Sequence, residues 1–287
     1  MLHTPITNAN YETVFVEKKT AEMVGIVTLN RPPHNRITMQ MMNEVMDAVG
    51  AFDADPDIRL IMIKGAGDDF GRGGDVEEIL SKDGWEANQF FMTVVKTAKS
   101  LRGAAKPTMA VVHGWTTAAS MVTAMNCDLV IAADNTLMGA TAIDFGLFCP
   151  WGPISIMPRQ VGLKRSFEVG ATGELVPASH LVEHGVINRM VPLAELDEAA
   201  MKFAAEITCK SPTAMMLHKK TFYAAQDMEY GKALDFGAAA MVQYHHTPEA
   251  KEGMRAFLEK RAPSWDIDGY TSDWSVRRKS DTTKVGL

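Results

Sequence analysis

Hydrophobic and polar residues follow two different periods along the first 205 residues. The stretch "ETVFVEKK" (12–19) alternates like a half-buried strand, while "IRLIMIKGAG" (58–67) and "TMAVVHGW" (108–115) are apolar runs typical of buried strands. Between them, residues 38–52 and 85–102 place apolar side chains at helical spacing, and Thr38 is the expected N-cap of the first helix. Strands that alternate with helices predict an α/β fold in which helices cover a sheet.

The last part of the chain is almost wholly helical from about Ser211 onward. In "HTPEAKEGMRAFLEKRAP" (246–263), Thr247 is the expected N-cap and Pro248 the first helical residue. We therefore divide the chain into a core (1–205), a C-terminal helical region (206–265) and a polar tail (266–287). We expect the helical region to pack on a neighbouring subunit.

Composition excludes several classes of partner. The net charge of the 287 residues is -6, and no dense Lys/Arg tract is present, so nucleic acid is not expected as a partner. No window has the length and apolarity of a membrane span, and the N-terminus is not typical of a signal peptide. The three cysteines lack metal-site spacing and favour a reduced compartment. We expect a cytoplasmic protein without a metal site.

The stretch "FGRGGDVEEI" (70–79) carries three glycines in four positions, which indicates backbone that turns sharply or approaches another group. It lacks the ending of a P-loop and the spacing of a dinucleotide fingerprint. The stretch "HGWTTAASMVTAMNCD" (113–128) also predicts a tight strand exit before a helix. Two such helix starts can aim two backbone N–H groups at one anion, as in an oxyanion hole. Two tight turns without a binding role are the alternative.

These segments carry a family resemblance. The order of "NRPPHN", "GAGDDFGRGGDVEEI", "KPTMAVVHGW", "CDLVIAADNTLMG" and "EAKEGMRAFLEKRAP", from about Tyr11 to Pro263, resembles the crotonase superfamily, the enoyl-CoA hydratase/isomerase family. The resemblance implies a spiral of ββα units with a helical C-terminal oligomerisation region, assembled as a homotrimer or a dimer of trimers. It also implies an acyl-CoA thioester substrate whose enolate is stabilised. Coenzyme A would then arrive as part of the substrate, with no permanently bound cofactor.

The resemblance also assigns residues. The two oxyanion donors would be the backbone N–H groups of Gly74 and Ala119, the latter where the family usually has the middle of a Gly-Gly-Gly run. The segments that would contact coenzyme A are the turn after "NRP", the glycine-rich stretch and the last helix. Their candidate residues are Arg36, Ile37, Gly73, Asp75, Val76, Phe257 and Lys260, the last two often reaching a neighbouring subunit.

Both glutamates that hydratases of this family carry are missing. Their positions hold Val122 and Ala142, so hydration by paired carboxylates is not expected. If residues 142–144 are extended, Asp144 faces the same side as Ala142 and can present a carboxylate as acid or base. A solvated or helix-capping aspartate is the alternative reading of Asp144.

Four other side chains have both a functional and a structural interpretation. Arg72 could contact a substrate anion or lie on the surface. His113 could act in catalysis or serve only the fold. Trp115 and Trp151 could shape an apolar acyl pocket or belong to the core.

The sequence therefore predicts an atypical acyl-CoA enzyme, with isomerase, lyase or hydrolase chemistry favoured over hydration. Two alternatives stay open. One is a carbon–carbon bond hydrolase of cyclic diketones, which uses no coenzyme A. The other is an inactive family member that binds acyl-CoA or a protein partner.

Overall fold

The computed structural model describes residues 10–265, which are built around a six-stranded sheet. The strands lie in the order β1-β2-β3-β4-β6-β9, with β1 antiparallel to β2 and the other neighbours parallel. Their bounds are β1 (Val14–Lys19), β2 (Val24–Leu29), β3 (Leu60–Gly65), β4 (Thr108–Val112), β6 (Leu129–Ala133) and β9 (Arg189–Val191). A smaller sheet joins β5 (Trp115–Thr117), β7 (Leu137–Gly139) and β8 (Val176–Pro177).

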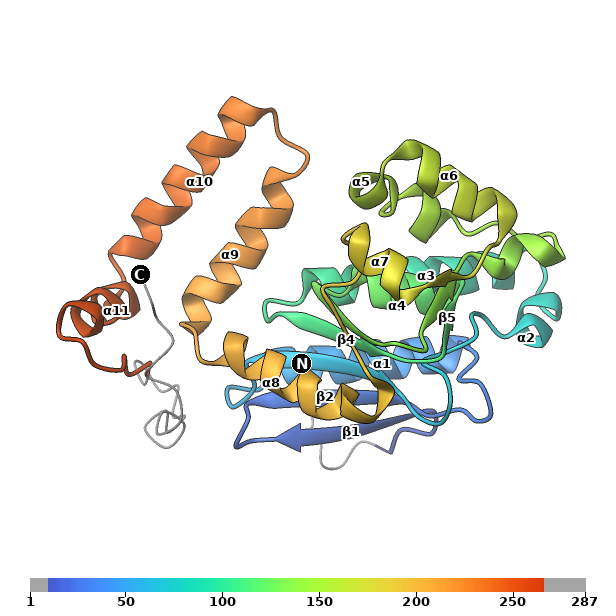
Figure 1. Ribbon diagram of the computed structural model, residues 1–287, viewed down its shortest axis with the longest axis horizontal. Helices are drawn as coiled ribbons and strands as arrows, with labels where there is room; N and C mark the ends of the chain where they lie inside the picture. The colour runs from blue at the N-terminus through green and yellow to red at the C-terminus, as the bar shows by residue number, and fades with distance from the viewer. Residues whose placement is uncertain (1–9, 266–287) are drawn as a thin grey trace.

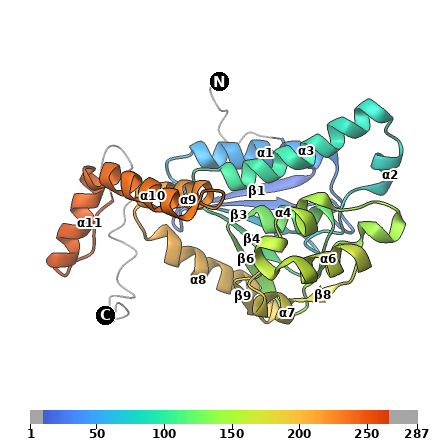
Figure 2. The same ribbon diagram turned by 90° about the horizontal axis from the view of Figure 1, so that it is seen from above.

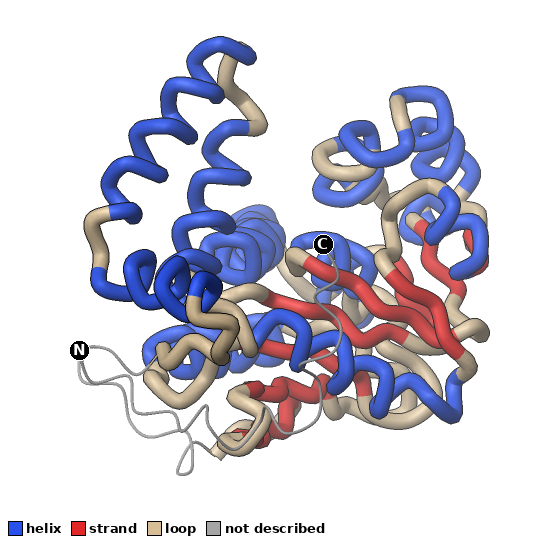
Figure 3. The backbone as a smooth tube through the Cα atoms, turned by 60° about the vertical axis from the view of Figure 1, so that its left-hand side comes forward, coloured by secondary structure: helices blue, strands red, loops and turns tan. Residues whose placement is uncertain are grey.

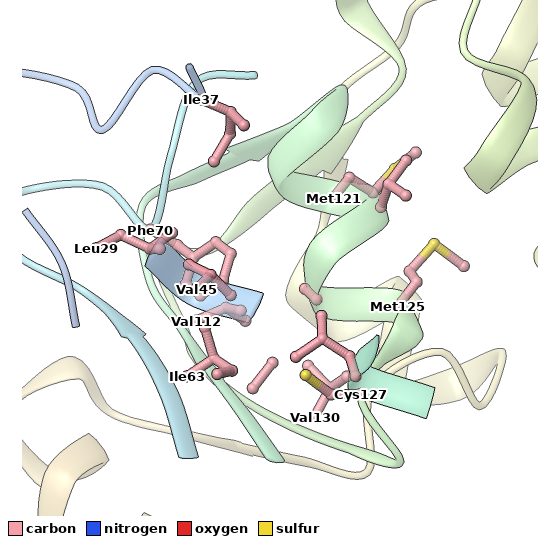
Figure 4. Packing of buried hydrophobic residues seen from close by; sticks show 14 of the residues in the cluster. Leu29, Ile37, Val45, Ile63, Phe70, Val112, Met121, Met125, Cys127 and Val130 are labelled. Carbon is pink, nitrogen blue, oxygen red and sulfur yellow. The ribbon is translucent and has the colours of Figure 1, made fainter. Parts of the chain in front are cut away.

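Helices cover both faces of the large sheet, because successive residues of each strand point to opposite faces. In β3, Ile61 and Ile63 pack with α1 (Met39–Ala54), α3 (Gly84–Gly103) and α4 (Ala119–Asn126). Leu60 and Met62 of the same strand pack with α8 (Leu196–Thr208) on the other face. Figure 4 shows strand side chains meeting α4 in the first of these layers, and Figure 1 shows the layers themselves.

The α/β class is confirmed, and the predicted helices and strands are present within a few residues of their bounds, except that the predicted strand 108–115 ends at Val112 and Trp115 begins β5 of the smaller sheet. Thr38 caps α1 as expected, since its hydroxyl accepts the N–H of Met41 at 3.1 Å. Thr247 caps the last helix in the same way, by accepting the N–H of Ala250. No helix within residues 10–265 is long and apolar enough to cross a membrane.

The remaining helical elements fall into two groups, those between β3 and α8 in the chain and those of a C-terminal arm. The first group is α2 (Val76–Leu80), η2 (Thr141–Phe145), η3 (Pro150–Ile154), α5 (Pro158–Val161), α6 (Leu163–Thr172), α7 (Ala178–Glu183) and η4 (Leu193–Glu195). The C-terminal arm is α9 (Pro212–Ala225), α10 (Tyr230–His245) and α11 (Pro248–Leu258). Figures 1 and 3 show that α9 and α10 run side by side away from the sheet.

The proposed boundary at residue 205 falls inside α8. Ala200, Phe203 and Ala204 of this helix pack on the sheet, so we move the proposed boundary to the turn between α8 and α9, at residues 209–211. The predicted tail (266–287) lies outside the described residues.

A buried lysine ties the C-terminal arm to the core. The Lys219 ammonium on α9 lies 2.8 Å from the carboxylate of Asp128, and both side chains are mostly buried, at 6% and 14% exposure. The same ammonium donates to the carbonyl oxygens of Leu101 and Lys106 at 3.2 and 3.0 Å. Three core segments therefore converge on one charged group of the arm.

We expect Lys219→Met to lower the free energy of unfolding by about 3–5 kcal/mol, because it leaves the Asp128 carboxylate buried without its cation. Urea unfolding followed by circular dichroism measures this difference. Lys202→Met is the matched control, since Lys202 pairs with Glu198 on an exposed helix face and should cost less than about 1 kcal/mol. Equal losses in the two variants would contradict the role given to Lys219.

Candidate active site

The glycine-rich segment 71–74 lies against the start of α4. Gly71 pairs with Thr116 in a parallel bridge. The N–H of Gly73 donates to the Ser120 hydroxyl at 3.2 Å. A Cβ on Gly71 would collide with the same hydroxyl, so this position has no room for a side chain. The three glycines therefore let the backbone of residues 71–74 come close to the first turn of α4, as predicted from the sequence.

Gly73 and Ala118 form the tightest part of this contact. Gly73 has φ +81°, and a Cβ there would lie 2.9 Å from the Ala118 Cβ. Ala118, the residue before α4, has φ 46° and ψ -115°. A positive φ costs a non-glycine residue about 1–2 kcal/mol. The surrounding packing thus holds Ala118 in a strained conformation that sets the direction of the next N–H group.

Two backbone N–H groups face one cavity from these segments. Ile37 donates to the Gly73 carbonyl at 2.7 Å and accepts the Asp75 N–H at 2.9 Å, so the N–H of Gly74 points away from this bridge. Ala119 is the first residue of α4, where N–H groups have no helical acceptor. Within residues 10–265, neither the Gly74 N–H nor the Ala119 N–H donates a hydrogen bond.

The cavity that both residues line has a volume of about 300 Å³. Its walls come from α2, α3, α4 and the segment 142–151. The lining residues are Gly74, Val76, Ile79, Phe90, Phe91, Val94, Ala118, Ala119, Ala142, Phe145, Leu147, Phe148, Cys149, Pro150 and Trp151. Among the described residues, these walls offer one ionisable side chain, the Cys149 thiol. The described part of the chain holds no cluster of three or more His, Cys, Asp or Glu side chains suited to a metal ion.

One of the two positions where the resemblance expects a hydratase glutamate lines this cavity. Ala142 is among the lining residues, whereas Val122 lies on α4 with its side chain buried in the core. The predicted extended conformation of residues 142–144 is wrong, because residues 141–145 form the 3₁₀ helix η2. The reason given for placing Asp144 on the same side as Ala142 therefore does not hold. Asp144 is exposed and does not line the cavity. The Asp144 carboxylate lies toward Gly173, because a Cβ built on Gly173 would be 2.9 Å from the Asp144 Oδ1.

The predicted coenzyme A contacts fall into two groups. Arg36, Ile37, Gly73, Asp75 and Val76 lie together, because the bridge between Ile37 and Gly74 joins their two segments. They adjoin the cavity through Val76, which is among its lining residues. This group therefore lies next to the Gly74 donor, with Ile37, Gly73 and Asp75 buried and Val76 exposed.

Phe257 and Lys260 do not join that group within one chain. Phe257 is 65% exposed on α11, and Lys260 follows the helix. Figures 1 and 2 place α11 and α2 at opposite ends of the molecule. If these two residues contact coenzyme A, they do so at the site of another subunit.

Asp75 also fixes the start of α2. Its carboxylate caps the helix by accepting the Glu78 N–H at 3.0 Å, and it pairs with Arg31 at 2.7 Å. Burial alone would raise the pKa of Asp75, but the Glu78 N–H and the Arg31 guanidinium outweigh burial and hold this pKa below its usual value. The charged Asp75 therefore holds the turn that carries Gly74.

Arg72, His113 and Trp115, which have both a functional and a structural interpretation in the sequence, make contacts within the fold. Arg72 donates to the Asp69 carboxylate at 2.7 Å and lies over the Trp115 ring, 4.7 Å from its centroid. The His113 Nε2 lies 2.8 Å from the Gly67 carbonyl oxygen. None of these lines the cavity, whereas Trp151 does.

Sequence reasoning named Trp151 as a possible pocket wall but missed the walls that α3 and residues 145–150 supply. The α3 residues Phe90, Phe91 and Val94 follow the helical period of a core face. The stretch "GLFCPW" (146–151) was the available signal, because it is apolar without a strand or helix period and lies in a connection. Phe148 within it is 68% exposed and lines the cavity.

Comparisons with known proteins agree with this geometry. The family model "Enoyl-CoA hydratase/isomerase" matches residues 19–268. A crotonyl-CoA hydratase of Syntrophomonas wolfei is 30% identical over 253 residues, which cover 88% of this chain and 96% of the relative. The human mitochondrial enoyl-CoA hydratase domain-containing protein 3 is 31% identical over 246 residues, covering 84% of this chain and 80% of that protein.

A solved structure shares the fold. The enoyl-CoA hydratase of Mycobacterium smegmatis superposes with a TM-score of 0.85 at 28% identity, over 89% of this chain and 100% of that one. The ββα spiral predicted from the sequence is therefore confirmed.

We expect Cys149 to react slowly with iodoacetamide at neutral pH, because burial raises the pKa of its thiol to about 11 and the thiolate is the reactive form. Raising the pH should therefore increase the alkylation rate about tenfold per unit from pH 7 to 9.5. Mass spectrometry of the Cys149 peptide measures the rate. Glutathione is the control, whose rate should begin to level off in this range. A plateau for Cys149 below pH 9 would contradict the prediction.

Proposed function

The chain belongs to the enoyl-CoA hydratase/isomerase family, and from this premise we propose that it binds an acyl-CoA thioester with the carbonyl oxygen between Gly74 and Ala119. The observation that carries the proposal is the pair of unused N–H groups that these residues present to one apolar cavity. Fixed donors in a site of low polarity stabilise the negative charge that develops on a thioester oxygen as its enolate forms.

The reaction that we propose is isomerase, lyase or hydrolase chemistry. Two relatives carry hydratase names, but the positions assigned to hydratase glutamates hold Val122 and Ala142 here. Hydration in that family uses two carboxylates to move protons. In the proposed reaction, the enzyme polarises the thioester, and water or the substrate carries the proton.

A second candidate function is acyl-CoA binding without turnover. The specific observation in its favour is the cavity lining, whose one ionisable group among the described residues is a thiol held protonated by its raised pKa. Calorimetry with free coenzyme A, crotonyl-CoA and aromatic or alicyclic acyl-CoAs tests binding, and product analysis of the same mixtures tests turnover. Binding without turnover across the series would favour this candidate. Binding of no thioester would favour the diketone hydrolase.

We also propose that the chain assembles as a homotrimer or a dimer of trimers through its C-terminal arm. Helix α10 buries no residue within the chain. Its Leu234, Met241 and Val242 are between 56% and 64% exposed, and an apolar surface of this kind favours contact with a second copy. Sedimentation velocity distinguishes a trimer and a hexamer from a monomer, and a monomer would contradict this proposal.

We expect Ala119→Pro to lower turnover of the true substrate by about 10²–10³-fold, the usual effect of removing one oxyanion donor. Proline is favoured at the first position of a helix, where the lost N–H makes no helical bond, so α4 should persist. Steady-state kinetics measures the loss, and thermal unfolding checks the fold.

Ala119→Gly is the matched control, because it keeps the N–H and removes only the methyl group. Its turnover should stay within about tenfold of the wild type, well above that of the proline variant. Similar activity in the proline and glycine variants would show that the Ala119 N–H takes no part in the reaction.

Asp144→Asn tests whether the Asp144 carboxylate acts as an acid or base in place of the two glutamates. Because Asp144 is exposed and does not line the cavity, we expect turnover within about threefold of the wild type, far from the 10²-fold or greater loss typical of a removed acid or base. The pH profile of kcat/KM should also be unchanged. A loss of that larger size would restore Asp144 as the acid or base predicted from the sequence.

A further inference from the structure

A second cavity meets the first at Trp151. It has a volume of about 650 Å³ and lies between α3, α9 and the segment that follows Trp151. Within residues 10–265, Trp151 is the one residue that lines both cavities. Removal of its side chain is therefore the simplest way to join them.

Helix α3 shows how the two cavities are arranged. Phe91 and Val94 line the first cavity, and Val95 and Ala98 line the second. The second cavity thus follows the first along this helix, with Trp151 at the junction. The Trp151 ring packs on Phe91, with 5.9 Å between ring centroids and 32° between the ring planes.

The main chain around Trp151 is held in place. A Cβ on the next residue, Gly152, would lie 2.7 Å from the Met121 Cε on α4, so this segment is pressed against the helix. The Gly152 carbonyl accepts the N–H groups of Ile156 and Met157 at 3.1 and 3.0 Å. The indole is therefore a wall carried on fixed backbone, and a smaller side chain would leave an opening in its place.

The walls of the second cavity are mainly apolar, with four cationic side chains among them. One of these, Arg102, lies over the Tyr223 ring at 4.5 Å from its centroid. Ala98, Ala104, Ile156 and Met216 supply apolar walls. Lys99 and Lys220 are exposed, so their ammonium groups reach solvent while their methylene stems cover the cavity. The Lys219 ammonium is already bonded to Asp128.

We propose that Trp151 determines substrate specificity by limiting the acyl group to the length that the first cavity holds. Without the indole, a longer acyl tail extends along α3 into the second cavity. This inference rests on the proposed function, because it requires the thioester to lie between Gly74 and Ala119.

The test is calorimetry with hexanoyl-CoA and dodecanoyl-CoA on the full chain. For the wild type, dodecanoyl-CoA should bind no more tightly than hexanoyl-CoA. In Trp151→Ala, the Kd of dodecanoyl-CoA should fall by about tenfold or more, because several methylene groups leave water, while that of hexanoyl-CoA stays within about threefold. Trp151→Phe keeps part of the wall and should gain less affinity for dodecanoyl-CoA than Trp151→Ala does. Trp151→Leu replaces the alanine variant if thermal unfolding shows that alanine is not tolerated.

Ala98→Trp, added to the Trp151→Ala variant, tests where the tail lies. It refills the second cavity and should remove the gain for dodecanoyl-CoA. If the gain persists, the tail leaves by another route and the inference is overturned. It is also overturned if hexanoyl-CoA binds but no variant favours the longer chain. If no thioester binds more tightly than free coenzyme A, the proposed function fails and this inference fails with it.

Discussion

The close packing of residues 71–74 against the first turn of α4 is the contact on which the candidate site depends. The two segments follow β3 and the β4–β5 strands, and β3 and β4 are parallel neighbours, so their carboxyl ends reach the same edge of the sheet. Gly73 permits this approach through its positive φ and its missing side chain. Without this contact, the Gly74 and Ala119 N–H groups would not face one cavity.

The two candidate donors, the N–H groups of Gly74 and Ala119, belong to the backbone, so their directions do not depend on the side chains around the cavity. The N–H of Gly74 is directed by the bridge to Ile37, and that of Ala119 by the conformation of Ala118 and the helix start. Neither depends on a side chain at position 122 or 142. The glutamate positions can therefore hold valine and alanine while the two donors stay in place. The side chains at positions 122 and 142 and the directions of the two N–H groups can thus vary independently in this fold.

The parts of the fold that follow a clear period could be predicted from the sequence, whereas most of the cavity walls, apart from Trp151, could not. The apolar runs in β3 and β4 and the caps Thr38 and Thr247 each have a local physical cause. Residues 141–145 have no period that separates a strand from a 3₁₀ turn, and the Gly146 and Leu147 N–H groups bond back to Ala142. Because of this short turn, Asp144 does not line the cavity beside Ala142. The packing of α3 and residues 145–151 around one cavity depends on distances between elements, which no local pattern specifies.

An apolar cavity makes the two N–H donors more effective and at the same time limits what the chain can do. Under the proposed function, apolar walls that exclude water leave the field of fixed dipoles weakly screened, so charge on a thioester oxygen is strongly stabilised. The same exclusion disfavours ionised side chains, and the Cys149 thiol accordingly stays protonated. Discrimination between substrates must then come mainly from shape, because the described lining offers few polar groups to an acyl chain. The proposed function therefore assigns the choice of substrate to the aromatic walls, and to Trp151 at the junction of the two cavities above all.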